Sequence, residues 1–178
     1  MELKEIAKNI REELKKHGIT TKQVSVKSKY SGYESIINII IKDLTINKKI
    51  IENIVKKYEK IRWDDYTNEI LEGGNVFINI DFDYKVLKEK TEELIPLAQE
   101  LIKKGKNYKA GECITVAKKD DLIILYSPHY YNCNSPEITL CKKTNSCILD
   151  DLERYYAGGI YNIAEALAIL KYQYSFEL

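Results

Sequence analysis

The stretch that most constrains the fold of this chain runs from Gln23 to Asp43 and reads QVSVKSKYSGYESIINIIIKD. Val24 and Val26 alternate with serine and lysine, which is the two-residue period of a strand with one face in water. The segment from Ser35 to Ile41 is nearly all apolar and predicts a second strand that is covered on at least one face. Between them, Tyr30-Ser-Gly-Tyr33 supplies the glycine that a reversal needs. The sequence therefore predicts a β-hairpin with an aromatic tip, whose basic first strand lies nearer a sheet edge.

Amphipathic helices are predicted on both sides of this hairpin. Apolar residues recur every three or four positions over residues 2 to 17 and over residues 50 to 58, as on the buried side of a helix. Gly18 ends the first helix, and His17 lies in its last turn, where cations are favoured. Asn47 is among the capping groups that precede the second helix.

A third strand completes the first half of the chain. Gly73-Gly74 turns into residues 75 to 82, where apolar and polar residues alternate again. The class predicted for residues 1 to 85 is α+β, a small antiparallel sheet with helices packed on one face. Its other face is expected to expose Lys27, Lys29, Asn38 and Asn79.

The second half is predicted to be another small α+β lobe. Residues 86 to 104 have helical spacing and are assigned to a connecting helix, with a kink or break before Pro96. The lobe itself, residues 105 to 178, is expected to contain three short strands and two C-terminal helices. The strands are expected at residues 113 to 117, 122 to 126 and 137 to 141, and the helices at residues 146 to 156 and 160 to 172.

The charge balance and the lack of long apolar segments exclude several classes of function. The chain has 178 residues, with 28 Lys and Arg against 27 Asp and Glu, for a formal net charge of +1. This balance supports neither a basic nucleic-acid coat nor an acidic DNA mimic, so contact with nucleic acid requires a local patch. The first residues lack the apolar run of a signal peptide, and no stretch approaches the ~20 apolar residues of a membrane span. We expect a protein of the bacterial cytoplasm that does not bind membranes.

One group of histidine and cysteine residues is a candidate metal site. His129, Cys133, Cys141 and Cys147 make up the ligand set of a tetrahedral zinc site, but their spacing is longer than that of the usual paired knuckles. Packed thiols are the simpler interpretation, and whether these four residues hold a metal stays open. Cys133 with His129 lacks a visible third catalytic partner.

Other catalytic signals are weak as well. The acidic pairs are Asp64-Asp65, Asp81 with Asp83, and Asp120-Asp121, and aspartate gathers at turns and strand ends for conformational reasons. No phosphate-binding glycine loop or nucleophile elbow is visible. We therefore expect no enzyme activity and no cofactor, and an enzyme is the third hypothesis.

Binding is the remaining class. The chain has 14 tyrosines, several of them in pairs at predicted loop tips or helix ends. Tyrosine gives a large amphipathic contact area at low entropic cost, and lysine supplies charge for phosphates. The predicted partner-binding residues are Lys27, Lys29, Tyr30, Ser31, Tyr33, Lys42, Tyr130 and Tyr131.

The first half also resembles a known family. The matching segments are Arg11-Glu-Glu-Leu-Lys15, Val24-Ser-Val-Lys-Ser-Lys-Tyr-Ser-Gly32, Ser35-Ile-Ile-Asn-Ile39 and Trp63-Asp-Asp-Tyr66. On these segments, residues 1 to 85 resemble one of the large-polyvalent-protein-associated domains of phages and mobile elements. A free-standing protein of this size is also similar to a phage-derived type II anti-CRISPR, a Cas9 inhibitor of the gut-Clostridium kind.

The resemblance implies a function in evading host defence. The leading hypothesis is a non-enzymatic anti-CRISPR protein that binds a Cas9-type effector with its guide RNA and blocks target DNA engagement or cleavage activation. The alternative is a nucleic-acid-binding antirestriction or accessory module of a mobile element, which contacts double-stranded DNA through Lys27, Lys29 and Tyr30. The oligomeric state stays open.

Overall fold

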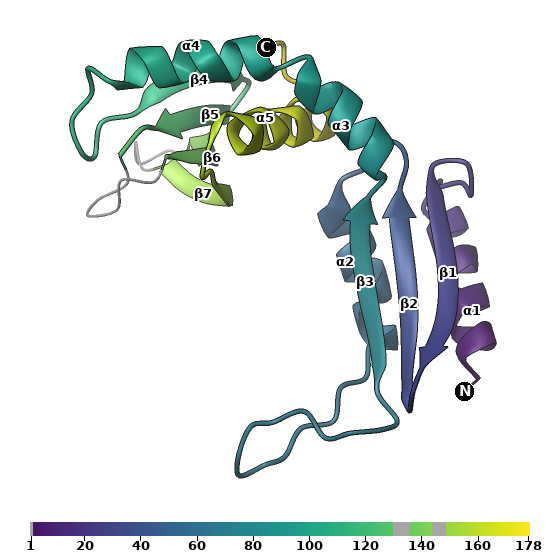
Figure 1. The fold of residues 1–178 in the computed structure, drawn as a ribbon. Coiled ribbons are helices and arrows are strands. Elements are labelled where there is room, and N and C mark those ends of the chain that lie inside the picture. Colours follow the sequence, from purple (N-terminus) through teal and green to yellow (C-terminus); the bar gives the residue numbers. More distant parts are fainter. Residues whose placement is uncertain (1, 130–135, 144–148) are drawn as a thin grey trace. The chain divides into compact units, whose positions relative to one another are not determined.

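The computed structural model describes residues 2–129, 136–143 and 149–178. The chain divides into two compact units, Met1–Val86 and Leu87–Leu178 (Figure 1). Each unit has its own small sheet and its own buried hydrophobic cluster. Helices and small sheets make up both units, so the predicted α+β class is confirmed.

The first unit contains a β-hairpin flanked by helices. Its elements are α1 (Leu3–Lys16), β1 (Val24–Ser31), β2 (Glu34–Ile41), α2 (Lys48–Val55), a 3₁₀ helix η1 (Lys56–Tyr58) and β3 (Val76–Phe82). β1 and β2 pair antiparallel through a two-residue turn, Gly32-Tyr33. Gly32 has a φ of 59°, at the turn position that favours glycine. The predicted hairpin is confirmed.

The first sheet is mixed, whereas the sequence predicted an antiparallel one. β3 runs parallel to β2, with Ile37 beside Ile78 and Ile39 beside Ile80. The physical reason is the connection. The long segment that contains α2 returns the chain to the end of the sheet where β2 began, and such a crossover joins parallel neighbours. The alternation of residues along β3 carries no information about its direction.

Both helices of the first unit pack on one face of this sheet (Figure 1). Their apolar residues meet the inward side chains of the strands, and the fully buried isoleucines are Ile10, Ile37, Ile39, Ile41 and Ile51. Asn47 caps α2, since its Oδ1 accepts a hydrogen bond of 2.9 Å from the Lys49 N–H. The helix positions predicted from apolar spacing are confirmed.

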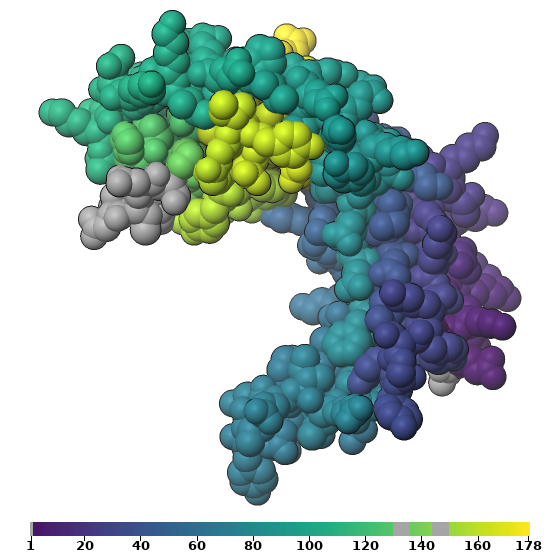
Figure 2. All heavy atoms as spheres, viewed as in Figure 1, coloured from purple at the N-terminus to yellow at the C-terminus, as the bar shows by residue number. Residues whose placement is uncertain are grey.

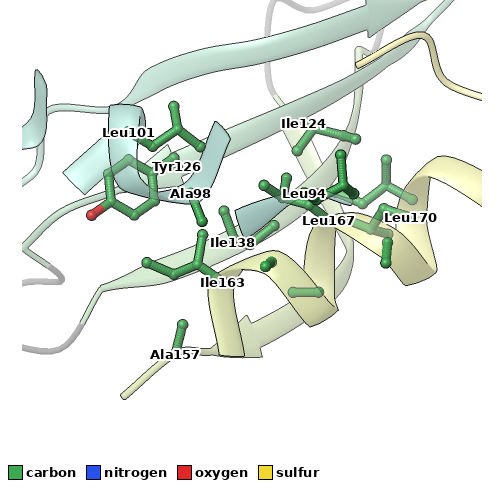
Figure 3. Close-up of a cluster of buried hydrophobic side chains, with 14 of the residues drawn as sticks. Leu94, Ala98, Leu101, Ile124, Tyr126, Ile138, Ala157, Ile163, Leu167 and Leu170 are labelled. Carbon is green, nitrogen blue, oxygen red and sulfur yellow. The ribbon is translucent and has the colours of Figure 1, made fainter. Parts of the chain in front are cut away.

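The second unit is a four-stranded antiparallel meander covered by helices on one face. Its elements are α3 (Tyr84–Glu92), which starts at the end of the first unit, α4 (Ile95–Gly105), β4 (Ile114–Lys119), β5 (Leu122–Ser127), β6 (Glu137–Lys143), β7 (Leu149–Tyr156) and α5 (Ile160–Tyr174). Figure 3 shows how side chains from both helices meet the strands: Leu94, Ala98 and Leu101 near α4, Ile163, Leu167 and Leu170 on α5, and Ile124, Tyr126 and Ile138 on the sheet.

The expected break before Pro96 is present. α3 ends at Glu92, and Pro96 lies in the first turn of α4, where its missing N–H costs no hydrogen bond. The segment that the sequence assigned to one connecting helix is therefore two helices. α4 belongs to the second unit, since Ala98 and Leu101 are buried in that unit's core.

One predicted helix is a strand. Residues 149–156 form β7, where the sequence predicted a helix over residues 146–156, so the unit has one C-terminal helix rather than two. Leu152, Tyr155 and Tyr156 have helical spacing, but so short a window is weak evidence. The edge of β6 offers hydrogen-bonding partners, and pairing such as Thr139 with Arg154 overrides local preference.

No helix in the described part of the chain has the length and apolar character needed to cross a lipid bilayer.

Candidate docking surface

The face of the first sheet turned away from α1 and α2 is called here the open face. Strand register places its side chains in rows: Ser25, Ile40 and Asp81; Lys27, Asn38 and Asn79; Lys29, Ile36 and Phe77. Lys27 and Lys29 are exposed, as the sequence predicted. Asn79 Nδ2 donates to Asn38 Oδ1 across the strands at 3.1 Å, so the central row is ordered. The open face therefore presents two exposed lysines, the exposed Asp81 and a polar central row between partly exposed apolar residues.

The aromatic tip of the hairpin adjoins this face. Tyr30 and Tyr33 expose 67% and 81% of their surface, and Ser31 between them is also exposed. Lys29 lies two residues before Ser31, so the cations begin next to the tip. Tyr30 alternates with Lys29 along β1, so the two side chains lie on opposite faces of the strand. The exposed tyrosines of the tip add amphipathic contact area next to the open face.

A carboxylate and an amide fix the conformation behind the tip. Glu34 accepts hydrogen bonds from the Gly73 N–H at 2.8 Å, from the Asn75 N–H at 3.1 Å and from Asn75 Nδ2 at 3.0 Å. The bond from Gly73, followed by those from Asn75, holds the pKa of Glu34 below its ordinary value, although burial opposes this shift. Asn75 is fully buried; its Oδ1 accepts from the Arg62 N–H at 2.8 Å and its Nδ2 donates to the Leu71 carbonyl at 2.7 Å. The Glu34–Asn75 pair thus ties the hairpin tip to the segment before β3.

That segment, residues 62–74, is called here the excursion. Figure 2 shows it, in blue-teal, projecting from the first unit. Trp63 and Ile70 face each other in an antiparallel bridge. The Asp64 carboxylate accepts from the N–H groups of Thr67 and Tyr66, both at 2.9 Å, and these bonds hold the pKa of Asp64 below its ordinary value. Local backbone bonding therefore gives the excursion a defined hairpin-like shape.

The end of the excursion is aromatic and acidic. Tyr66 is 96% exposed, and about half of the surface of Trp63 and Ile70 is exposed. The charged residues of the excursion are Asp64, Asp65, Glu69, Glu72 and Arg62, which give a net charge of −3. Aromatic residues in an acidic setting suit contact with a basic protein surface. From the sequence, Trp63 and Tyr66 were not predicted as binding residues and contributed only to the resemblance. The missed signal was a long connection between a helix and a strand that carries large aromatic residues.

The structure does not bring all of the predicted binding residues together. Lys42 is exposed but follows β2 at the end of the strand away from the tip, about 23 Å from Ser35 at ~3.3 Å per residue. Tyr130 and Tyr131 lie outside the described residues.

The candidate metal ligands of the second unit lie partly within the described residues. Cys133 and Cys147 lie outside the described residues, and within the described ranges no group of three or more His, Cys, Asp or Glu could hold a metal ion. Burial, together with the bond from its thiol to Asp151, raises the pKa of Cys141 to about 12. A raised pKa favours the protonated thiol, which is a poor nucleophile.

Two aspartates from the acidic pairs, Asp64 and Asp83, close a turn and cap a helix. Asp83 Oδ1 accepts from the Lys85 N–H at 3.0 Å at the start of α3, and Asp64 closes the turn of the excursion. His17 is the C-cap of α1, next to Gly18 with a φ of 77°. Both observations confirm the conformational interpretation of these residues.

No protein-family model, curated protein or solved structure matches this chain.

Proposed function

We propose that this protein is an anti-CRISPR inhibitor that binds a Cas9-type effector loaded with guide RNA and blocks target DNA engagement or the later activation of cleavage. The type of target is taken from the resemblance of residues 1 to 85 described above. The observation that carries the proposal is the combination, in one unit, of the exposed lysines of the open face with the acidic aromatic excursion, joined through the Glu34–Asn75 pair.

This combination fits a ribonucleoprotein better than it fits protein or nucleic acid alone. Lys27 and Lys29 suit RNA or DNA phosphates, whereas the carboxylates of the excursion repel a nucleic-acid backbone and suit a basic protein surface. Trp63 and Tyr66 are residue types that supply much of the binding energy in protein interfaces. The hydrogen bonds to Glu34 and Asn75 order this surface before binding, which lowers the entropic cost of association.

A cleavage assay with guide-loaded Cas9-type effectors tests the proposal. Wild-type protein is expected to inhibit cleavage when it is added before the target DNA. Lys27→Glu combined with Lys29→Glu, and separately Trp63→Ala combined with Tyr66→Ala, are expected to weaken inhibition by tenfold or more, since each pair removes one half of the surface.

The matched control is Lys4→Glu combined with Lys8→Glu, the same charge change on the exposed side of α1. This variant is expected to inhibit like the wild type. Full cleavage in the presence of the wild type, together with no binding to any guide-loaded effector tested, contradicts the proposal. Equal loss of inhibition in the control shows a nonspecific charge effect and also contradicts it.

One observation favours the alternative of a nucleic-acid-binding accessory module. Lys42 adds a third exposed lysine beyond Lys27 and Lys29 along the same hairpin. A duplex contacted through these lysines would bind without any effector, and its affinity would fall steeply with salt. Gel-shift titrations at two salt concentrations separate the alternatives, because an effector-dependent inhibitor does not require affinity for free duplex.

A further inference from the structure

Each edge of the first sheet is covered by the chain itself over part of its length. At the outer edge of β1, the Val26 carbonyl accepts a hydrogen bond of 2.7 Å from Arg11 Nη2, and the Val24 N–H donates to the Thr20 carbonyl at 3.0 Å. The chain's own helix and turn therefore occupy one backbone group of Val24 and one of Val26, near the start of this edge. An open edge is a template for pairing with another strand, and proteins commonly block it in such ways.

The outer edge of β3 is closed at one residue. Val76 donates to the Lys60 carbonyl at 2.7 Å and accepts from the Lys60 N–H at 3.0 Å, in antiparallel pairing. Because backbone groups alternate in direction along a strand, the N–H and C=O of Ile78 and Ile80 also point away from β2. Among the residues that the structure describes, neither pair of groups has a partner on that side.

A groove of about 590 Å³ runs beside this part of β3. Val55, Ile78 and Ile80 supply apolar side chains to it. Its charged residues are of both signs: Lys48, Lys56, Glu52, Glu59 and Asp81. The unpaired edge of β3 and the apolar lining of the groove therefore lie at the same place, between β3 and α2.

We infer that the edge of β3 from Ile78 to Phe82 binds an extended peptide segment of a partner protein, which adds a fourth strand to the sheet. An added strand supplies the alternating N–H and C=O groups that Ile78 and Ile80 lack. The pairing at Lys60 shows that an extended segment already fits the neighbouring position of the same edge. Alternate side chains of the peptide lie over Val55 and Ile80, so apolar residues are required at every second position.

The nearly balanced charges of the groove predict that this binding depends little on salt, unlike contact with phosphates. The site adjoins the open face at Asn79 and Asp81 but does not include Lys27 or Lys29, and it does not depend on the proposed inhibition of Cas9.

The experiment uses the full-length chain and a displayed library of ten-residue peptides. Enriched peptides are expected to share a two-residue apolar period. Amide hydrogen exchange is expected to be fast at Ile78 and Ile80 in the free protein and slowed at both when an enriched peptide binds. The amides of Asn79 and Asp81 point toward β2 and should be protected with and without peptide.

The matched control changes the peptide and leaves the protein intact. N-methylation of peptide residues whose N–H faces β3 is expected to reduce affinity by at least about tenfold, whereas N-methylation of the alternate residues should have little effect. Ile80→Pro, which removes an outward N–H, should lower the affinity similarly. If this variant does not fold, the peptide comparison and the exchange data still decide.

Three results overturn the inference. The first is no enriched peptide, or binding that is indifferent to which set of peptide residues is methylated. The second is peptide-induced protection that bypasses Ile78 and Ile80. The third is slow exchange at the amides of Ile78 and Ile80 in the free protein, because this means that the edge of β3 is already paired. Sedimentation then shows whether a second copy of the chain pairs with it.

Discussion

The two sheets of this protein differ in the face that is turned away from their helices. In the first unit that face is the open face, where Lys27, Lys29 and Asn79 are exposed. In the second unit the corresponding face contains buried polar residues: Glu137 is 2% exposed and Thr139 is 5% exposed. Both faces are built from strands that carry polar residues, so strand composition alone does not distinguish a binding surface from an interior.

The buried polar residues of the second sheet bind to one another. Thr139 Oγ1 donates to Glu137 Oε1 at 2.7 Å, and Arg154 Nε lies 3.2 Å from the same oxygen. Cys141 Sγ donates to Asp151 Oδ1 at 3.3 Å, and Arg154 also pairs with Asp151. Such a network contributes to specificity of folding and uses its charges internally. The first sheet thus leaves polar groups of its open face exposed, whereas the second pairs its polar groups with one another.

Removing the cation that pairs with the buried Glu137 carboxylate is expected to have the largest effect on stability. Arg154→Ala leaves the Glu137 carboxylate buried without its cation, and we expect the free energy of unfolding of the second unit to fall by about 3 kcal/mol. Urea denaturation measures the loss, and amide exchange in β6 assigns it to this unit. Combining Glu137→Gln with Arg154→Met removes both charges and is expected to recover part of the stability. An Arg154→Ala protein as stable as the wild type would show that the second sheet does not depend on this pairing.

Removing the buried amide behind the tip tests the first unit. Asn75→Ala deletes the bonds to Glu34 Oε1, the Arg62 N–H and the Leu71 carbonyl, and we expect a loss of about 2 kcal/mol in the free energy of unfolding. The control is Asn79→Ala on the open face, where the same change at an exposed residue should cost no more than about 0.5 kcal/mol. Equal losses for the two variants would contradict the distinction between the support of the surface and the surface itself.

The contribution of Glu34 to the free energy of unfolding depends on pH. Its removal is expected to have a smaller effect than Arg154→Ala or Asn75→Ala. Because hydrogen bonds lower the pKa of Glu34 in the folded state, its stabilisation is fully present above pH 4.5, the ordinary pKa of the group. This stabilisation is lost as the pH falls from 4.5 through the lower pKa that Glu34 has in the folded protein. We therefore expect Glu34→Gln to be less stable than the wild type at neutral pH, with the difference shrinking below pH 4.5.

Urea denaturation of both proteins over a series of pH values measures this difference. Glu52→Gln, at an exposed carboxylate on α2, is the control and should show no comparable gap at neutral pH. A gap between Glu34→Gln and wild type that grows toward acid pH would reverse the sign and remove Glu34 from the support of the tip.

The sequence by itself determined the local elements with strong patterns. The apolar spacing of α1, α2 and α5 specified both the helices and their buried sides, including Ile163, Leu167 and Leu170. Val24 to Ile41 specified the hairpin and the exposure of Lys27 and Lys29, because alternation along a strand directs side chains to opposite faces. These features depend on neighbours in the chain, which a sequence shows directly.

Only the tertiary structure decided the features that depend on residues far apart in the chain. The direction of β3 follows from the return path through α2, and the strand conformation of β7 follows from pairing with β6. The Glu34–Asn75 pair joins residues separated by 41 positions. Neither residue belongs to a sequence pattern from which this pairing could be predicted. The reason is that hydrogen bonding and burial are satisfied by whichever groups the fold brings together, and these partners leave no periodic signal in the sequence.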